Sequence, residues 1–325
     1  MSKRTFAYRG FWSLIVLSAA LLFSNSLGAA EWQKLTWDKA PKNKKGEFRN
    51  ASTIGIVAKN NVYFGFSGSK LAHWNGKSFK KVKYKVVKDG KKVKKVDIRN
   101  FVINSEKDIW AFGDNGLALH YDGSKWKNVE NPYTGKGRRE GRLWGSGCPK
   151  PDLCFAGTRG GALIQWDGKG WKEVGSPAEG ARIYSMAFPS KNIGWMAGEA
   201  FFAKWDGKKW KRLDIEAPRM YDMALLGKNY GWAVGDGGAF FKFDGKTFTK
   251  LNVKGSFFRM RGVGCSSKNN CWAGGDAGAL FKWDGKGWTK VKLGTFERFN
   301  RVKFGHGQGF LVGNKALIYK FTGKM

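Results

Sequence analysis

One short phrase recurs along the chain and constrains its fold more than any other feature. The phrase places Asp-Gly or Asn-Gly between two aromatic residues, as in HWNGKSF at 73–79 and KWDGKGW at 282–288. The glycines of its seven instances are Gly76, Gly123, Gly168, Gly207, Gly245, Gly285 and Gly323. Successive glycines lie 38 to 47 residues apart. A period near 40 residues that contains only strand-length segments predicts the blades of a β-propeller rather than a helical solenoid.

Each repeat divides into four short strands. In the unit at 219–251 the strands are expected at 219–225, 230–236, 238–244 and 247–251. Asp-Gly between the third and fourth strands suits a two-residue type I′ hairpin, which needs residues that tolerate positive φ. The aromatic residues before and after the turn can pair across the hairpin or fill the contact between blades.

The two ends of the chain predict how the ring closes. The last repeat stops at FTGKM (321–325), where a fourth strand should follow. The segment EWQKLTW (31–37) matches the fourth strand of the other units. We therefore expect an all-β, seven-bladed propeller of four-stranded antiparallel blades over 31–325, with the N-terminal strand completing the last blade. Closure of this kind removes free sheet edges.

Units with the pattern GWAVGD at 231–236, followed by WDGKGW-like turns, resemble a known group of propellers. They are similar to the photosystem II stability/assembly factor-like proteins and to the wider bacterial-neuraminidase-repeat (BNR) group, over the whole of 31–325. The match to the BNR Asp-box is partial, because Asp and Gly adjoin at 284–285 instead of being separated by one residue. The resemblance implies a binding or assembly module without catalysis of its own, with an arginine patch spread over the blades.

One arginine stands near the start of the expected first strand in every unit. The seven are Arg49, Arg99, Arg142, Arg182, Arg219, Arg259 and Arg298. The first strand of a propeller blade lies nearest the axis, so these side chains are expected around the central opening on one face. The resemblance supports this ring as a ligand-binding site.

Aromatic residues follow these arginines two positions later. They are Phe101, Trp144, Tyr184 and Tyr221, and strand alternation points them to the same side as the arginines. Guanidinium groups beside aromatic faces can hold carboxylates, phosphates or stacked rings. The arginines and the aromatic residues Trp144, Tyr184 and Tyr221 are therefore candidate ligand-binding residues.

A structural role for the arginines is the alternative. The turns between the second and third strands are expected on the same face, and four of them carry an acid: Asp114, Glu199, Asp236 and Asp276. These acids could pair with arginines and join neighbouring blades. The corresponding turns of units 1, 3 and 7 have no acid, which favours ligand binding by Arg49, Arg142 and Arg298. Replacing Arg49, Arg99 and Arg142 together is expected to abolish binding if the ring is the site.

The first three links between blades are strongly basic. They span 37–49, 85–99 and 130–142, and the second reads as a projecting hairpin with its turn at 89–90. Their candidate ligand-binding residues are Lys91, Lys92, Arg138 and Arg139. Solvated, mobile loops are the alternative for any one link. Three adjacent basic links favour a polyanion-binding sector over blades 1–3.

The four cysteines form two equally spaced pairs, Cys148 with Cys154 and Cys265 with Cys271. Both pairs occupy the same place in their repeats, and in an exported protein this spacing predicts two local disulfides. A metal site is the weaker alternative, because no histidine or further cysteine completes a ligand set.

The first thirty residues read as a secretory signal peptide. Three basic residues precede an apolar run at 11–23, and small residues lead to a cut after Ala30. An uncleaved anchor is the alternative, although the run is short for a membrane span. We therefore expect an exported protein, periplasmic or extracellular. Residues 31–325 hold 56 Lys and Arg against 25 Asp and Glu, an excess that attracts acidic partners or protects exposed sheet edges.

The sequence offers little for catalysis. The three histidines, His73, His120 and His306, lack the spacing of metal ligands, and no nucleophile elbow or phosphate loop is present. The Phe/Tyr-Arg-Ile-Pro signature of sialidases is missing, so a glycosidase acting on anionic glycans is the least favoured function. We expect no catalytic residues, no cofactor and no metal.

These observations predict a monomeric, non-catalytic propeller that binds an acidic partner through its arginine-rich face. A protein-assembly or stability factor is the first hypothesis. The alternative is a binder of an anionic polymer such as nucleic acid, acidic polysaccharide or lipopolysaccharide, and the positive charge could also favour association with the cell envelope.

Overall fold

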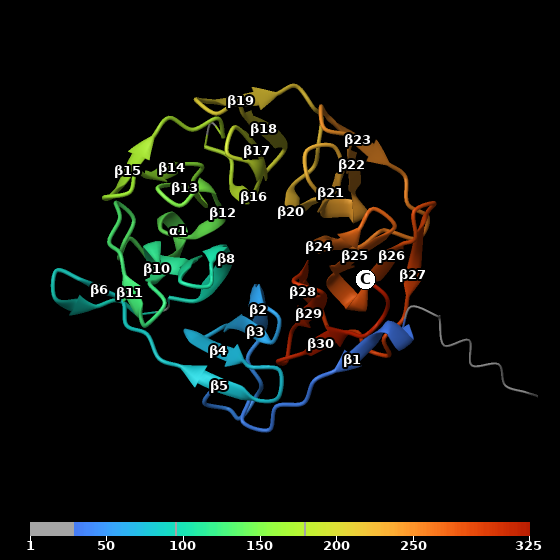
Figure 1. Cartoon of the computed structure of the whole chain (residues 1–325), viewed down its shortest axis with the longest axis horizontal. Helices are drawn as coiled ribbons and strands as arrows, with labels where there is room; N and C mark the ends of the chain where they lie inside the picture. The colour runs from blue at the N-terminus through green and yellow to red at the C-terminus, as the bar shows by residue number, and fades with distance from the viewer. Residues whose placement is uncertain (1–28, 95, 179) are drawn as a thin grey trace, which may run out of the picture.

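The computed structural model describes residues 29–325 except 95 and 179. Within that range the strands form seven four-stranded sheets, arranged around a central axis, and one two-stranded hairpin (Figure 1). The expected seven-bladed propeller is confirmed. All but the last two residues of the expected signal peptide (1–30) lie outside the described residues. No helix in the described part of the chain is both long enough and apolar enough to span a bilayer.

The first six blades run outward from the axis in chain order. The first strand is largely buried, as in β2, whereas the outermost strand is half-buried or exposed, as in β5. Blade 1 comprises β2 (Ala51–Ala58), β3 (Asn61–Phe66), β4 (Lys70–Trp74) and β5 (Phe79–Val82); blade 2 comprises β8 (Ile98–Ser105), β9 (Asp108–Gly113), β10 (Ala118–Tyr121) and β11 (Trp126–Asn128); blade 3 comprises β12 (Leu143–Lys150), β13 (Leu153–Thr158), β14 (Leu163–Trp166) and β15 (Trp171–Val174).

The next three blades repeat this plan. Blade 4 comprises β16 (Ile183–Ser190), β17 (Ile193–Gly198), β18 (Phe201–Trp205) and β19 (Trp210–Leu213); blade 5 comprises β20 (Met220–Leu225), β21 (Gly231–Gly235), β22 (Phe240–Phe243) and β23 (Phe248–Leu251); blade 6 comprises β24 (Met260–Ser267), β25 (Asn270–Gly275), β26 (Leu280–Trp283) and β27 (Trp288–Val291). First strands of neighbouring blades pack side by side around the axis.

Blade 7 joins the two ends of the described chain. Its order is β1–β30–β29–β28, so the early strand β1 (Trp32–Lys34) is the outermost and pairs antiparallel with β30 (Ile318–Phe321). The inner strands are β28 (Phe299–Gly305) and β29 (Gln308–Gly313). The predicted closure of the ring by the N-terminal strand is confirmed, because β1 is hydrogen-bonded along the outer side of β30.

The recurring aromatic phrase builds the contacts between blades. In blade 6, Trp283 and Trp288 face each other across the hairpin. Both rings contact the fully buried Trp232 of blade 5, with ring centroids 4.8 and 5.0 Å apart. Equivalent buried tryptophans in the second strands of other blades are Trp110, Trp195 and Trp272. The phrase therefore holds the fold together, because each hairpin presents two aromatic rings to the blade before it.

The turn inside the phrase differs from the expected type I′ hairpin. Gly285 has φ 98°, but neither Asp284 nor Lys286 has positive φ. A single left-handed residue at the first central position excludes type I′ and fits type II′. The Asp284 carboxylate accepts hydrogen bonds from the backbone N–H groups of Lys286 and Gly287, both at 2.9 Å. The aspartate thus organises the turn from its side chain, without adopting positive φ itself.

Both predicted disulfides are present. Cys148–Cys154 joins β12 to β13, and Cys265–Cys271 joins β24 to β25. Each bridge therefore closes the short turn between the first and second strands of its blade.

Removing the second bridge with Cys265→Ser/Cys271→Ser is expected to lower the free energy of unfolding by about 2 kcal/mol, because the bridge restricts a short loop in the unfolded chain. Urea unfolding of the oxidised wild type and the variant measures the difference. A reductant should lower the free energy of unfolding of the wild type below that of the variant, since it opens both bridges. An unchanged midpoint in the variant would contradict the assignment.

The propeller has two faces with different construction. The links between blades pack onto the turns between second and third strands, as where Asn131 Nδ2 donates to Gly116 O at 2.7 Å and Ser256 Oγ donates to Gly238 O at 3.0 Å. We call this side the link face and the opposite side, which holds the WDGK turns, the turn face. The short helical segments are η1 (Ala29–Glu31), η2 (Asp114–Gly116), α1 (Gly137–Glu140), η3 (Asp236–Gly238) and η4 (Asp276–Gly278), and all but η1 belong to the link face.

The second link forms the predicted basic hairpin. Strands β6 (Val87–Lys88) and β7 (Lys91–Lys92) pair around Asp89 and Gly90, which both have positive φ. Figure 1 shows the hairpin extending outward past β11 at the rim of the ring. Asn128 Nδ2 in β11 donates to Val87 O at 3.0 Å and holds it there. The hairpin projects as expected, but away from the axis.

Candidate binding site on the link face

Backbone hydrogen bonds define which residues are equivalent around the axis. In each blade, the carbonyl just before the first strand accepts the N–H of the residue that follows the second strand, as between Arg219 O and Asp236 N at 2.9 Å. The residues that provide this carbonyl are Asn50, Asp97, Arg142, Arg182, Arg219, Arg259 and Arg298. Five of the seven predicted arginines share this position. The expectation of one register for all seven is wrong for blades 1 and 2.

Arg49 and Arg99 are the two exceptions. Arg49 lies one residue too early, and its Nε donates to the carbonyl of Lys42 in the preceding link at 3.2 Å. Arg99 lies two residues after Asp97, inside β8. Aligning the units by their arginines therefore shifts blade 1 by one residue and blade 2 by two residues relative to the other blades.

A bulge near the start of each first strand aims a second set of side chains at the axis. In β16, for example, Ile183 pairs with Gly198 and Ser185 with Ala197, which leaves Tyr184 unpaired. Bulges of this kind redirect a side chain. The residues at this position are Ser52, Arg99, Trp144, Tyr184, Tyr221, Arg261 and Asn300.

Phe101 does not belong to this set, which corrects its predicted orientation. It lies two residues beyond the bulge of β8 and is buried between blades 1 and 2. Its ring centroid lies 6.4 Å from those of Tyr63 and Trp126.

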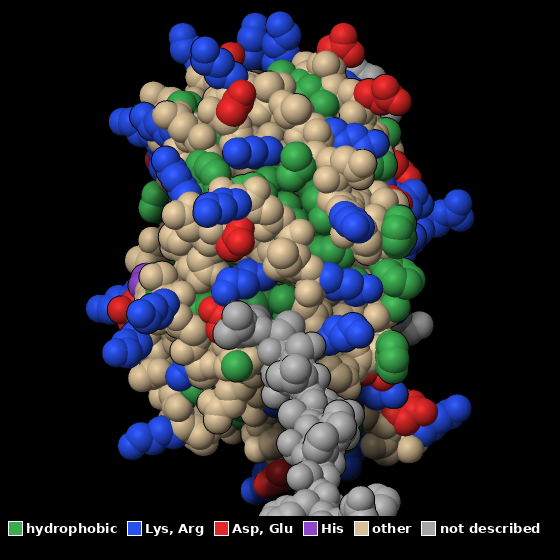
Figure 2. All heavy atoms as spheres, turned by 90° about the vertical axis from the view of Figure 1, so that its right-hand side faces the viewer, with side chains coloured by type: hydrophobic (Ala, Val, Ile, Leu, Met, Phe, Trp, Pro, Cys, Tyr) green, Lys and Arg blue, Asp and Glu red, His purple; other side chains and the backbone are tan. Residues whose placement is uncertain are grey.

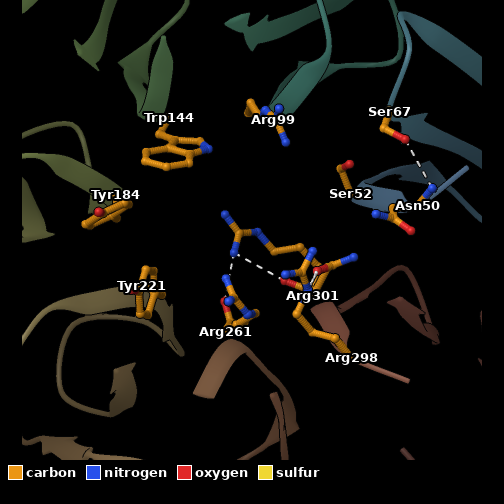
Figure 3. A pocket seen from close by; sticks show the side chains of 11 residues that line it. Asn50, Ser52, Ser67, Arg99, Trp144, Tyr184, Tyr221, Arg261, Arg298 and Arg301 are labelled. Carbon is orange, nitrogen blue, oxygen red and sulfur yellow. Dashed lines mark hydrogen bonds between the residues drawn. The ribbon is translucent and has the colours of Figure 1, made fainter. Parts of the chain in front are cut away.

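The bulge residues surround a cavity of about 160 Å³ at the axis (Figure 3). Trp144, Tyr184 and Tyr221 form one wall, with ring centroids 4.8 and 4.9 Å apart in succession. Figure 3 shows guanidinium groups opposite this wall. The residues that line the cavity include Trp144, Tyr184, Tyr221, Arg261, Arg298 and Arg301. We call this space the central cavity.

A buried carboxylate pairs with three arginines on the blade 2–3 side. Asp114, at the start of η2, has no exposed side-chain surface and contacts Arg99, Arg138 and Arg142 at 2.7 to 2.8 Å. Asp97 adds a contact to Arg138 at 2.6 Å. The expectation that Arg142 lacks an acid is wrong, because the acid comes from the turn of the neighbouring blade.

A second chain of ion pairs runs across blades 4 to 6. Glu199 contacts Arg182 at 3.5 Å and Arg219 at 2.5 Å. Asp236 contacts Arg219 at 3.3 Å and Arg259 at 2.5 Å. Hydrogen bonds to Tyr221 and Glu199 raise the pKa of Arg219 above its usual value. Each acid joins an arginine of its own blade to one of the next, so the structural alternative for these arginines is correct.

The blade 7 side of the cavity keeps uncompensated positive charge. Within the described residues, no carboxylate pairs with Arg298 or Arg301. Arg298 Nε donates to Asn300 Oδ1 at 2.8 Å, and Arg301 Nη1 donates to Arg261 O at 2.8 Å. The buried Nε of Arg301 has no acceptor among the described groups. Burial, and then the charge of Arg261, lower the pKa of Arg298.

Sequence reasoning selected Arg298 but missed Arg301 and Arg261. Arg261 pairs with Asp276 and still borders the cavity. The available signal was a second arginine two or three positions after the first, in RMR at 259–261 and RFNR at 298–301. The second arginine is visible in the sequence, but whether its side chain faces the axis depends on the bulge in the first strand.

The predicted basic residues of the links lie apart from the central cavity. Lys91 and Lys92 are on the outer hairpin, and Arg138 is held by Asp97 and Asp114. Arg139 borders a separate hollow of about 610 Å³ between blades 3 and 4, beside Arg159. The structure therefore divides the expected polyanion-binding sector into separate patches.

The central cavity is suited to binding an anion. Two guanidinium groups without carboxylate partners face an aromatic wall across a space smaller than the pockets of about 300–1,000 Å³ that hold drug-sized ligands. Forked N–H donors and aromatic faces together suit a carboxylate on a short side chain or chain end. Across the described chain, no group of three or more His, Cys, Asp or Glu residues is placed to hold a metal ion.

Comparison with solved structures places the fold among seven-bladed propellers. The structure of YCF48 bound to D1 peptide is 15% identical, with a TM-score of 0.69 over 90% of this chain and 96% of that chain. YCF48 from Cyanidioschyzon merolae is 14% identical, with a TM-score of 0.68 over 90% and 98%. The expected resemblance to photosystem II assembly-factor propellers is thus confirmed at the level of structure.

An enzyme is also among the structural neighbours. A catalytically inactive virginiamycin B lyase from Staphylococcus aureus, solved with quinupristin, is 12% identical, with a TM-score of 0.69 over 89% of this chain and 98% of that chain. No family model matches the sequence, and neither does any curated protein. At these identities the likeness describes the fold alone.

Proposed function

We propose that this protein is an exported, non-catalytic binding propeller that acts as an assembly or stability factor for an acidic protein partner. The link face receives the partner, and one acidic side chain or chain end enters the central cavity. The observation that supports this most is the pair Arg298 and Arg301, which face Trp144 and the tyrosines without a carboxylate of their own.

Three features favour a protein over an anionic polymer. Five of the seven ring arginines already contact Asp114, Glu199 or Asp236, so the face is less cationic than its arginine content implies. Arg298 and Arg301, which have no carboxylate partner among the described residues, lie at a small cavity rather than along a groove. A structural neighbour, YCF48, has also been solved with D1 peptide. An anionic polymer remains the second candidate, because residues 31–325 carry 56 cations against 25 acids.

Binding of an acidic peptide should depend on the two unpaired arginines. For a fluorescein-labelled, glutamate-rich ten-residue peptide, Arg298→Gln/Arg301→Gln is expected to weaken binding about tenfold or more, since two charge-assisted contacts are lost. Fluorescence anisotropy gives the affinity. The matched control, Lys169→Gln/Lys208→Gln, removes the same charge from exposed turns of the turn face and should change affinity far less.

A labelled single-stranded DNA separates the two candidate functions. Polymer binding would weaken steeply and log-linearly with salt and would decline for both variants, because it depends on many phosphate contacts. The proposal is overturned if the DNA binds more tightly than the peptide, or if Arg298→Gln/Arg301→Gln leaves the affinity for the peptide unchanged.

A further inference from the structure

Four phenylalanines stand exposed on three consecutive links of the link face. Phe296 is 91% exposed and Phe257 is 78% exposed, and Phe258 and Phe48 are each nearly half exposed. They lie in the links that enter blades 6, 7 and 1, within two residues of Arg259, Arg298 and Arg49. Figure 2 shows hydrophobic side chains protruding along one edge of the disc, with lysines and arginines around them. We call these four residues the phenylalanine sector.

Two of the links that carry these phenylalanines pack closely on glycines of the neighbouring turns. Gly278 in η4 packs against the link so closely that a Cβ there would lie 2.0 Å from Thr295 O and 3.2 Å from the Phe296 Cα. Gly238 in η3 packs in the same way against Ser256, the residue before Phe257. Link and turn therefore touch through backbone just before Phe257 and at Phe296, and both rings stand exposed beside these contacts.

The sector lies in a cationic surrounding. Without Arg298, which lines the central cavity, the three links at 38–49, 252–259 and 292–297 hold eight Lys and Arg against three Asp and Glu. Lys42 Nζ lies 4.7 Å from the centre of the Phe48 ring, so charge and aromatic surface adjoin directly. A surface that combines protruding apolar side chains with surrounding cations matches a membrane interface with negatively charged headgroups.

We propose that the phenylalanine sector binds the surface of an anionic lipid bilayer. The four rings enter the boundary between headgroups and acyl chains, and the surrounding lysines contact the phosphates. A lipid surface fits better than a protein because the four rings are spread over three separate links, whereas protein hot spots are compact and ringed by packed neighbours. The sector is distinct from the central cavity, so this inference does not rest on the proposed function.

Flotation with lipid vesicles tests the sector. The protein spanning residues 31–325 should float with phosphatidylcholine vesicles that contain phosphatidylglycerol, and much less with phosphatidylcholine alone. Phe257→Ser/Phe258→Ser/Phe296→Ser is expected to lower partitioning about tenfold or more, because three apolar side chains no longer enter the interface. The same three positions changed to Leu should retain most of the binding.

Variants that remove positive charge provide the second part of the flotation experiment. Lys42→Gln/Lys44→Gln/Lys45→Gln should weaken binding to the anionic vesicles, whereas the turn-face control Lys169→Gln/Lys208→Gln/Lys286→Gln, with the same loss of charge, should have little effect. Arg298→Gln/Arg301→Gln should leave flotation unchanged, which separates this test from that of the central cavity. Thermal unfolding confirms that the exposed substitutions leave the fold intact.

Three results would overturn the proposal. One is the absence of binding to anionic vesicles, and another is equal binding by the Ser and wild-type proteins. The third is a wild-type dimer that dissociates in the Ser variant without any vesicle binding, which would assign the sector to a second copy of the chain.

Discussion

Asp114→Asn is expected to lower the free energy of unfolding by about 3–5 kcal/mol, the usual cost of breaking a buried ion pair from one side. The substitution keeps the shape of the side chain but removes the charge that holds Arg99, Arg138 and Arg142. Asp97 remains, yet of these three arginines it contacts Arg99 and Arg138 and not Arg142. The melting temperature should fall by roughly 5–15 °C, as measured by calorimetry.

Asp276→Asn is the matched control for this prediction. Asp276 occupies the equivalent turn of blade 6, but about a third of its side chain is exposed and it contacts Arg261 alone. The expected loss is below about 1 kcal/mol, because solvent screens the pair. Equal losses for Asp114→Asn and Asp276→Asn would show that the buried cluster does not join blades 2 and 3 as described.

Trp32→Ala should be comparably destabilising, by about 3–5 kcal/mol, since it empties a buried aromatic site. Trp32 is 6% exposed and contacts Trp272, Phe304 and Phe321, with ring centroids 5.1 to 6.0 Å apart. It is also the first residue of β1, so weakening its packing releases the strand that closes the ring. Urea unfolding of the variant measures the loss, and light scattering should reveal aggregation through the exposed edge of β30.

Trp37→Ala tests whether the effect belongs to the closing strand. Trp37 stacks on Phe79 of blade 1 with a centroid distance of 5.0 Å but lies beyond the end of β1 and is only partly buried. Its loss should cost less, and the variant should remain soluble. If both substitutions have the same effect, the closure of blade 7 by β1 does not contribute as proposed.

The propeller could be predicted from the sequence because its signal is periodic. Turn glycines recur about every 40 residues with strand-length segments between them, and the missing last strand is Trp32–Lys34, within the predicted 31–37. The predicted hairpin type, type I′, was wrong because the Asp-Gly sequence is compatible with more than one turn type. In Asp284 the side chain supplies the hydrogen bonds, and only Gly285 adopts positive φ.

The candidate site was predicted less well, because it depends on register and on contacts between blades. The bulge in each first strand decides whether a residue faces the axis, and no residue type marks it. Arg99 therefore occupies the bulge position that the other blades give to their aromatic residues, and Phe101 is buried between blades 1 and 2. Likewise, Arg142 is neutralised by Asp114 of another blade, a contact between residues 28 positions apart that local sequence cannot reveal.

A double-mutant cycle measures the central claim most directly. The glutamates of the probe peptide are changed to glutamine one at a time, and each peptide is titrated against wild type and Arg298→Gln/Arg301→Gln. We predict that one glutamate couples to the arginine pair by about 1 kcal/mol or more, whereas its coupling to Lys169→Gln/Lys208→Gln stays within about 0.3–0.5 kcal/mol. Coupling below that limit for every glutamate would contradict entry of an acidic side chain into the central cavity.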